Sequence, residues 1–286
     1  MKLARIGAPM TERACVVRDD LAVDVSSFVR DFDEEFFGSE RIVALRDVAD
    51  AAFDAGRSFE WAGMRFGAPI ARPHQILCVG LNYADHARET GQAIPVEPII
   101  FNKSPNTLVG PDDDVLIPPG SVKTDWEVEL GIVIGRGSYR LPDLASAERA
   151  IAGYVVVNDV SEREYQLERG GQWVKGKSAP TFNPCGPFLV TPDEVGDVRD
   201  LAIWLDLNGR RMQDSRTSQM IFGPAHLVHH LSQFLRLEPG DLVNTGTPPG
   251  VGMGLKPPRY LTDGDRIELG IDGLGMQRQT FRATRP

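Results

Sequence analysis

Alternation of apolar and polar positions recurs along the chain and predicts many short β-strands. The clearest runs are "TDWEVELGIVIG" (124–135) and "AGYVVVNDVS" (152–161). Two further runs carry β-hairpin turn signals, Asn-Gly in "AIWLDLNGRRMQ" (202–213) and Asp-Gly in "DRIELGIDGLGMQRQTF" (265–281). Strands and helices do not alternate as they would in βαβ units. The pattern therefore predicts an α+β, mostly β fold with few helices.

One segment has helical periodicity. In "PAHLVHHLSQFLRL" (224–237), apolar residues recur at the spacing of one helix face. These residues are Leu227, Leu231, Phe234 and Leu235. We therefore predict an amphipathic helix here.

The chain divides near its first quarter. Residues 1–71 alternate short apolar runs with charged turns, as in "ACVVRDDLAVDV" (14–25), and predict a small β-rich domain. The Pro-containing segment "GAPIARPHQ" (67–75) then precedes the apolar run "ILCVGL" (76–81). We place a boundary there, with a second domain over residues 72–286.

Composition and charge narrow the class of protein. The 286 residues are 42% hydrophobic and 25% charged, as in ordinary globular proteins. The formal net charge of −9 argues against nucleic acid or an anionic membrane as a partner. Three dispersed cysteines predict free thiols in a reducing compartment, and no window is apolar enough to span a bilayer. We therefore expect a cytoplasmic protein.

A nucleotide-binding motif occurs in the sequence but lacks its context. Gly171 to Ser178 in "GGQWVKGKS" matches the P-loop pattern. A charged stretch precedes it where a P-loop needs a buried strand, and two prolines follow where it needs a helix. The segment "GVGMG" (250–254) likewise follows two prolines and precedes no helix. We expect neither segment to bind a nucleotide, and Lys177 must serve another chemistry.

Two glutamates point to a metal site. In the strand at 124–135, period-2 alternation places Glu127 and Glu129 on one face, roughly 7 Å apart along the backbone. Two carboxylates on one side of an apolar strand repel each other unless a cation neutralises them. The alternative is that this face is simply exposed to solvent.

The next predicted strand supplies a third carboxylate. The run "AGYVVVNDV" is almost uniformly apolar, as a strand buried on both faces would be, and Asp159 lies at its end. Three carboxylates with open positions suit Mg²⁺, Mn²⁺ or Ca²⁺. Hence Glu127, Glu129 and Asp159 are the predicted metal ligands.

Two more segments carry candidate polar groups. In "SEREYQLERG" (161–170), Ser161 and Glu164 form a capping box, so a helix should begin there with Arg163 and Gln166 on one face. In "GLNYADHARETG" (80–91), a short helix capped by Asn82 would place His86 and Glu89 together. A carboxylate beside a histidine suits a general base acting on water. For both pairs the alternative is a surface location without a catalytic role.

Together these segments resemble the fumarylacetoacetate hydrolase family over residues 76–281. The resemblance rests on six segments in family order: "GLNYADHARETG", "FNKSPNTLVGP", "KTDWEVELGIVIG", "GYVVVNDVSEREYQ", "WVKGKS" and "LVNTGTPPGVG". It implies a mixed, rolled β-sheet, a homodimer or larger homo-oligomer, and a central divalent metal ion, Mg²⁺ or else Mn²⁺ or Ca²⁺.

The resemblance also implies a role for each site residue. Glu127, Glu129 and Asp159 match metal ligands, and His86 and Glu89 match a pair on a lid that deprotonates water. Arg163, Gln166 and Lys177 match groups that stabilise an oxyanion or enolate. Thr247 matches a residue that contacts the substrate carboxylate, and Lys103 matches an active-site lysine.

The implied activity is metal-dependent cleavage of a C–C bond in an acylpyruvate or another 2,4-diketo acid, releasing pyruvate. That chemistry needs a metal for the 2-oxo acid, a base for water, and cations where negative charge develops. Relatives of this kind also decarboxylate oxo acids or isomerise dienoates. A catalytically silent protein that binds oxo acids is a further alternative.

Overall fold

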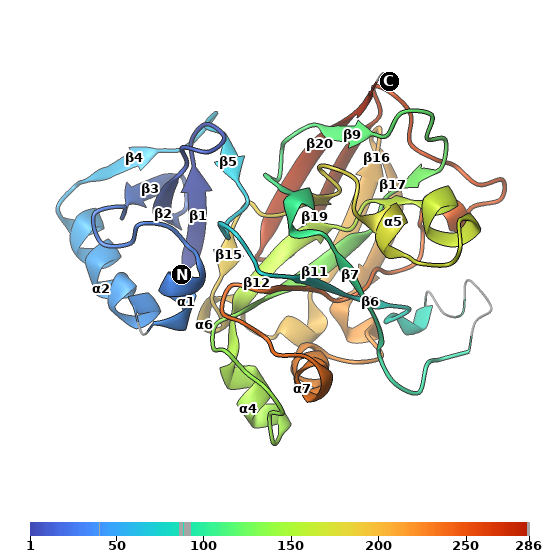
Figure 1. Cartoon of the computed structure of the whole chain (residues 1–286). Helices are drawn as coiled ribbons and strands as arrows, with labels where there is room; N and C mark the ends of the chain where they lie inside the picture. The colour runs from blue at the N-terminus through green and yellow to red at the C-terminus, as the bar shows by residue number, and fades with distance from the viewer. Residues whose placement is uncertain (40, 86–87, 89–92, 285–286) are drawn as a thin grey trace.

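A large mixed sheet runs through the whole molecule (Figure 1). The computed structural model describes residues 1–39, 41–85, 88 and 93–284. In spatial order the sheet consists of β4 (Ser58–Glu60), β3 (Leu21–Asp24), β2 (Arg13–Arg18), β1 (Lys2–Ile6), β15 (Leu189–Val190), β12 (Ile151–Asn158), β11 (Val128–Ile134), β18 (Leu242–Asn244), β6 (Ile76–Gly80) and β7 (Ile99–Lys103), with β5 (Phe66–Gly67) paired to β1. Neighbouring strands are antiparallel except β18 and β6, which are parallel.

A second sheet packs against the middle of the first. It contains β17 (Arg210–Arg216), β16 (Ala202–Leu207), β19 (Arg266–Ile271), β20 (Gly275–Ala283) and β9 (Val115–Ile117). Two short pairings, β10 (Thr124–Asp125) with β13 (Ser161–Glu162) and β14 (Asn183–Pro184) with β8 (Leu108–Val109), join loops near the strand ends. This confirms the predicted fold class, a mostly β architecture with mixed sheets.

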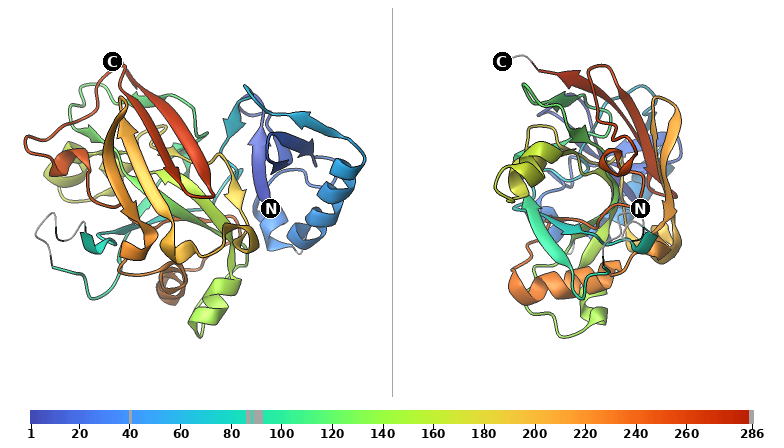
Figure 2. Two further views of the ribbon diagram at one scale, coloured as in Figure 1. Left: turned by 180° about the vertical axis from the view of Figure 1, so that it is seen from behind. Right: turned by 90° about the vertical axis from the view of Figure 1, so that its right-hand side faces the viewer.

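The described helices are few and mostly short. They are α1 (Glu34–Gly38), α2 (Arg41–Asp54), α4 (Leu144–Arg149), α5 (Val174–Lys177), α6 (Pro192–Val195) and α7 (Pro224–Phe234). Helices α2 and α7 bury side chains in the cores on the sheet faces. Single turns are η1 (Pro105–Thr107), η3 (Val198–Asp200), η4 (Thr217–Gln219), η5 (Gly252–Gly254) and the π-helical η2 (Glu164–Glu168). Helices α4 and α7 lie together at one end of the large sheet (Figure 2). None of the described helices is long and apolar enough to cross a membrane.

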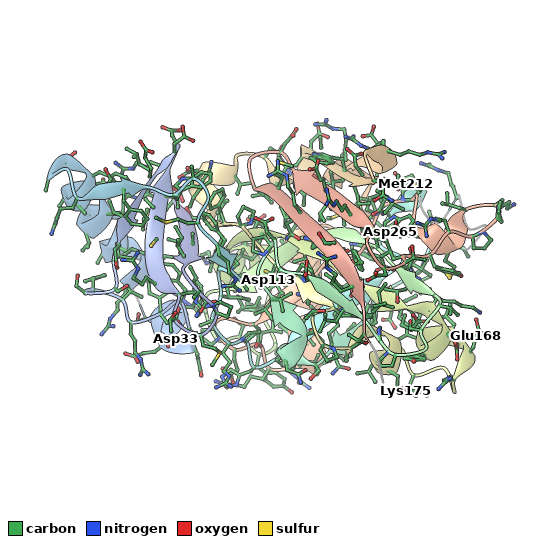
Figure 3. All side chains as sticks on the ribbon, turned by 90° about the horizontal axis from the view of Figure 1, so that it is seen from above. Asp33, Asp113, Glu168, Lys175, Met212 and Asp265 are labelled. Carbon is green, nitrogen blue, oxygen red and sulfur yellow. The ribbon has the colours of Figure 1, made fainter. Side chains whose placement is uncertain are left out.

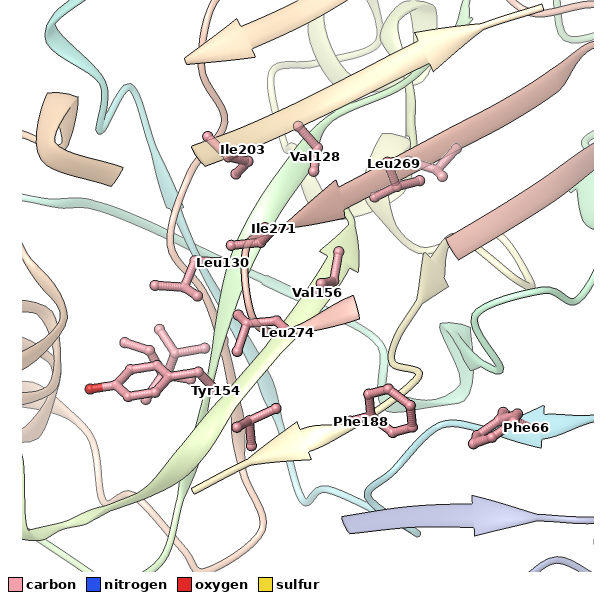
Figure 4. Close-up of a cluster of buried hydrophobic side chains, with 14 of the residues drawn as sticks. Phe66, Val128, Leu130, Tyr154, Val156, Phe188, Ile203, Leu269, Ile271 and Leu274 are labelled. Atoms are coloured by element: carbon pink, nitrogen blue, oxygen red, sulfur yellow. The ribbon is translucent and has the colours of Figure 1, made fainter. Parts of the chain in front are cut away.

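Strand β11 has apolar cores on both of its faces. Val128 and Leu130 pack with Ile203 and Leu269 of the second sheet (Figure 4). Val133, on the other face, belongs to a core shared with the N-terminal region. All seven residues of β11 and all eight of β12 are buried, so the two strands form the rigid centre of the fold.

The N-terminal region is joined directly to this centre. Strand β1 pairs with β15, with Leu3 opposite Leu189, so its strands continue the large sheet. Arg65 forms an ion pair of 2.7 Å with Asp113, which lies where the N-terminal strands adjoin the rest of the molecule (Figure 3). The predicted boundary near Arg72 falls between β5 and β6. The division into domains 1–71 and 72–286 stays a prediction.

The structure adds one element that the sequence did not predict and corrects one local prediction. The N-terminal region contains five strands and also the 14-residue helix α2, whose buried residues are mostly small, as with Ala49 and Ala52, and give a weak helical pattern. Helix α7 is confirmed, but Phe234 at its C-terminus is 62% exposed and not part of the apolar face. Both hairpin turns are confirmed: Asn208 and Gly273 lie in the turns with positive φ.

We predict that Leu130→Ala lowers the free energy of unfolding by about 2–5 kcal/mol, because it leaves a cavity between the two sheets. The matched control is Leu144→Ala, at a side chain that is 49% exposed, which should change it by less than about 0.5 kcal/mol. Urea unfolding followed by circular dichroism measures both. Equal effects of the two substitutions would contradict the placement of β11 at the centre of the core.

Candidate active site

Three buried carboxylates lie at the end of the central strands. Each of Glu127, Glu129 and Asp159 offers an oxygen atom within 4.8 Å of those of the other two. Glu127 is 8% exposed, and Glu129 and Asp159 are almost fully buried. The alternative of a solvent-exposed glutamate face is therefore wrong.

The pairing of β11 with β12 brings these carboxylates together. Val128 lies opposite Asn158, so Asp159 comes next to Glu127. The Asp159 N–H donates to the Glu127 carbonyl at 2.9 Å, and the Glu127 N–H donates to the Asn158 side chain at 3.2 Å. Alternation along β11 then directs Glu129 to the same side as Glu127.

Lys177 joins two of the three carboxylates. Its Nζ donates to Glu127 Oε2 at 2.7 Å and to Asp159 Oδ2 at 2.8 Å, and its side chain is buried. Lys177 ends α5, which packs closely on the segment that contains η2. A Cβ atom at Gly176 would lie 2.5 Å from both the Gln166 nitrogen and the Glu162 carbonyl oxygen. A glycine at 176 is therefore needed to bring Lys177 into the cluster.

A second lysine, Lys103, also binds Asp159. Lys103, at the end of β7, donates to Asp159 Oδ1 and, at 3.1 Å, to the Val160 carbonyl. Its side chain is fully buried and does not line the cavity described below. Lys103 therefore holds a carboxylate in place, and its predicted contact with substrate stays a prediction.

Arg163 is held on both sides by acids. Its Nη2 lies 2.8 Å from Asp125 Oδ2 and 2.7 Å from Glu127 Oε1, and its Nη1 donates to Gln166 Oε1 at 3.0 Å. The shared face predicted for Arg163 and Gln166 is thus present. The predicted capping box is absent, because Ser161 pairs in β13 with β10 and its hydroxyl donates to the Asp159 carbonyl. The helical turn begins only at Glu164.

These side chains line one cavity of about 160 Å³. Its polar residues are Glu127, Glu129, Arg163, Gln166, Lys177 and Thr247. The Thr247 hydroxyl donates to the Val128 carbonyl at 2.9 Å and accepts from Gln213 Nε2 at 2.8 Å. Because the hydroxyl hydrogen already donates to the Val128 carbonyl, the Thr247 hydroxyl has no hydrogen left to donate to a substrate carboxylate in this arrangement. The predicted contact between Thr247 and the substrate stays a prediction.

Burial and charge shift the pKa values of the cluster in opposite directions. Burial opposes the charge of Glu127, but Lys177 and Arg163 outweigh it and hold the pKa of Glu127 below its usual range. Burial, together with the carboxylates of Asp159 and Glu127, raises the pKa of Glu129 well above its usual range. Glu129 accepts the Gly246 N–H at 2.7 Å and has no ion pair among the described residues.

The carboxylate set fits a divalent cation. It offers three hard oxygen donors, which Mg²⁺ and Mn²⁺ prefer. Glu129 is the donor that the two lysines leave without a counter-charge, so a cation bound here would offset the cost of its burial.

The proposed water-activating pair lies outside the described residues, since His86 and Glu89 both fall there. Asn82 precedes them and is fully buried. Its side chain donates to the carbonyls of Phe222 and Thr245 and accepts the Phe222 N–H. It therefore fixes the start of this segment to the loops beside the cavity, and the helix cap that the sequence predicted stays a prediction.

The P-loop interpretation fails in the structure as the sequence predicted. Strand β13 is two residues long, η2 lies between it and the motif, and α5 ends within the motif at Lys177. The second glycine-rich segment forms only the single turn η5. Neither segment has the strand–loop–helix arrangement that binds phosphates.

Three residues of the site have no clear signal in the sequence. Asp125 binds Arg163 and also accepts the N–H groups of Gly252 and Met253 at 2.7 and 3.0 Å. Gln213 reaches from the second sheet to Thr247, and Trp173 forms a cavity wall. These contacts join segments far apart in the chain, so no local pattern indicates them.

The fold and the acidic site define a β-rich enzyme with a carboxylate centre suited to a divalent metal. Residues 75–282 match the family model described as fumarylacetoacetate (FAA) hydrolase C-terminal. The chain belongs to the fumarylacetoacetate hydrolase family, as its motifs suggested.

Individual relatives agree in fold and differ in activity. A Burkholderia multivorans protein, whose name gives a provisional hydrolase assignment and no substrate, is 47% identical over 100% of both chains. The structure of fumarylacetoacetate hydrolase from Exiguobacterium antarcticum is 32% identical, with a TM-score of 0.83 over 99% of this chain and 100% of that one. A 5-carboxymethyl-2-hydroxymuconate delta-isomerase from Mycobacterium smegmatis is 31% identical, with a TM-score of 0.79 over 100% of both chains. Hydrolases and isomerases thus share this fold.

We predict that Gly176→Ala lowers stability by about 1–3 kcal/mol, because the added methyl group forces α5 away from Gln166. Activity should fall as well, since Lys177 moves with the helix. Gly223→Ala is the matched control: a Cβ there meets no atom within 4 Å, and its φ is −72°. Thermal unfolding and turnover should both separate the two variants, and a fully active Gly176→Ala enzyme would contradict this role.

Proposed function

We propose that the protein is a divalent-metal-dependent hydrolase that cleaves a C–C bond in acylpyruvates or related 2,4-diketo acids to give pyruvate and a carboxylic acid. The observation that carries the proposal is the buried cluster of three carboxylates beside one small cavity, with Lys177 and Arg163 paired to these carboxylates in the cavity wall. Such a site places fixed cationic N–H donors where the negative charge of an enolate would develop.

Each polar group then has a defined task. Within the described contacts, Lys177 keeps one N–H beyond its two carboxylate partners, and Arg163 keeps one at Nη1. These two groups would donate to the 2-oxo acid end and stabilise the enolate that departs as pyruvate. Gln166, whose oxygen accepts from Arg163, would present its amide N–H groups to the same end.

Glu127, Glu129 and Asp159 would hold the metal ion. When bound, a divalent cation polarises the oxygens of a 2-oxo acid as a Lewis acid. The name of one solved relative, a Sphingobium maleylpyruvate hydrolase 26% identical to this chain, records a complex with manganese(II) and pyruvate. We propose Mg²⁺ or Mn²⁺ here, with Ca²⁺ as the third choice.

His86 and Glu89 would supply the base. The attack of water on the acyl carbonyl needs a group that takes the water proton, and a histidine oriented by a carboxylate suits this task. The proposal takes this pair from the sequence.

An isomerase is the second candidate, because three solved relatives at 31% identity are named as isomerases, one of them provisionally, of hydroxymuconate or heptadiene-dioate substrates. Oxo-acid decarboxylation is the third, since it needs the same cations without the base. We further propose a homodimer or larger homo-oligomer in the cytoplasm, with a small oxo acid as ligand and neither nucleic acid nor membrane as a partner.

We predict that Glu127→Ala weakens Mg²⁺ or Mn²⁺ binding by more than about 100-fold, since even outer partners of metal ligands are worth about 10–100-fold. Titration calorimetry measures the affinity, and circular dichroism checks that the fold persists. Glu168→Ala serves as control, at an exposed glutamate paired with Lys123. Unchanged affinity in Glu127→Ala would rule out this ligand set.

We expect His86→Ala to lower cleavage of acetylpyruvate by about 10²–10⁴-fold, because only hydrolysis needs an activated water. Decarboxylation of oxaloacetate should change little in the same variant. Steady-state kcat/KM for both substrates, with wild type alongside, gives the comparison. The hydrolase assignment is wrong if wild type prefers oxaloacetate and His86→Ala leaves acetylpyruvate turnover intact.

A further inference from the structure

The cavity lining combines the polar groups described above with large apolar side chains. The apolar side chains are Phe101, Leu167, Trp173, Val251 and Met253, and the Phe101 ring lies next to the polar groups, with its centroid 5.1 Å from Lys177 Nζ. A substrate whose 2-oxo acid group occupies the polar groups must therefore place its acyl tail against apolar side chains.

The aromatic part of this apolar lining is firmly packed. The rings of Phe101 and Trp173 meet edge to face, with centroids 5.1 Å apart. The Trp173 ring also lies on Gly80, where a Cβ atom would come within 2.8 Å of it. This packing leaves Trp173 little freedom to turn away, so the wall is a fixed feature of the cavity.

Among the described residues, no cation in the cavity lining is available for a second carboxylate. Arg163 and Lys177 are the only cationic side chains among the described residues that line the cavity. Arg163 is paired with Asp125 and Glu127, and Lys177 with Glu127 and Asp159. Each keeps one N–H within the described contacts, and the proposed function assigns that N–H to the 2-oxo acid group. A carboxylate at the other end of a substrate would lie unpaired against apolar side chains.

We infer that the tail of the substrate is uncharged and apolar, so that this enzyme takes monocarboxylic 2,4-diketo acids and discriminates against diacids. The inference rests on the proposed function of the same site. It separates this chain from solved relatives whose names specify dioate substrates, such as the isomerase from Mycobacterium marinum.

A matched pair of substrates tests the inference. 2,4-Dioxoheptanoate and 2,4-dioxoheptanedioate share one carbon skeleton and differ only in the terminal carboxylate. We expect kcat/KM to favour the monoacid by about tenfold or more, because an unpaired buried carboxylate is costly. A preference for the diacid would overturn the inference.

Binding of unreactive analogues keeps the test independent of catalysis. 2-Oxoheptanoate and 2-oxoheptanedioate lack the second carbonyl and cannot be cleaved, and calorimetry on the metal-loaded enzyme compares their affinities. Tighter binding of the monoacid without cleavage of either diketo acid would sink the proposed function and leave the tail preference standing. Equal or weaker binding of the monoacid would overturn the tail preference. If neither analogue binds, both proposals fail.

A positive charge placed in the apolar lining should reverse the preference for the monoacid. Leu167 lines the cavity and is 46% exposed, so Leu167→Arg can be accommodated without burying the new charge completely. We expect Leu167→Arg to raise kcat/KM for the diacid relative to the monoacid by about tenfold, because the new arginine can form an ion pair with the second carboxylate in a partly buried site. Leu167→Gln, polar but uncharged, is the control and should not improve the diacid. If the ratio of kcat/KM for diacid and monoacid is the same in Leu167→Arg as in wild type, the substrate tail does not reach Leu167.

One cation outside the cavity is a specific competitor. Arg88 is exposed, donates to Gln219 Oε1 at 3.4 Å, and does not line the cavity. Arg88→Gln should leave the monoacid preference unchanged. If wild type prefers the diacid and Arg88→Gln abolishes that preference, Arg88 binds the second carboxylate of the substrate and the inference is wrong.

Discussion

The ammonium group of Lys177, held between Glu127 and Asp159, is the interaction on which this structure depends. It joins β11, the end of β12 and α5 at one buried point. A buried ion pair stabilises a fold only when its geometry is good and its other donors and acceptors are satisfied. The elements around Lys177 must therefore be placed accurately. The fully buried strands β11 and β12 fix the positions of the carboxylates, and the close packing at Gly176 fixes the position of α5, which carries Lys177.

This arrangement divides the carboxylates into two kinds. Glu127 and Asp159 are buried but form ion pairs with the two lysines and with Arg163. Glu129 shares their cavity without a cation of its own in the described structure, and its pKa is raised by burial and by its neighbours. The protein thus supplies counter-charge to two of the carboxylates, and a bound divalent cation, as proposed, would supply it to the third. The cations of the site are already paired with these acids, and the rest of the described cavity lining is largely apolar.

Local features of the sequence predicted well what depends on local geometry. Period-2 alternation places Glu127 and Glu129 on one side of a strand whatever the strand packs against, and the Asn208 turn needs only its own backbone. Features that depend on distant segments were not predictable. Ser161 carries a sound capping pattern, but pairing with β10 makes it part of a strand. Asp125 looks like any strand-end acid until Arg163 and the loop at 252–253 close around it.

The P-loop pattern at 171–178 shows how one string of residues can arise from a different physical need. In a P-loop the glycines expose backbone N–H groups to a phosphate and the lysine binds its charge. Here Gly176 is required by packing against Gln166 and the Glu162 carbonyl, and Lys177 faces carboxylates. The Ser178 hydroxyl accepts the Ser104 N–H at 2.9 Å and so ties the motif to the loop after β7. The Lys177 charge that a P-loop would offer to a phosphate is here paired with Glu127 and Asp159 at 2.7 and 2.8 Å, and these are the same carboxylates that suit a divalent cation.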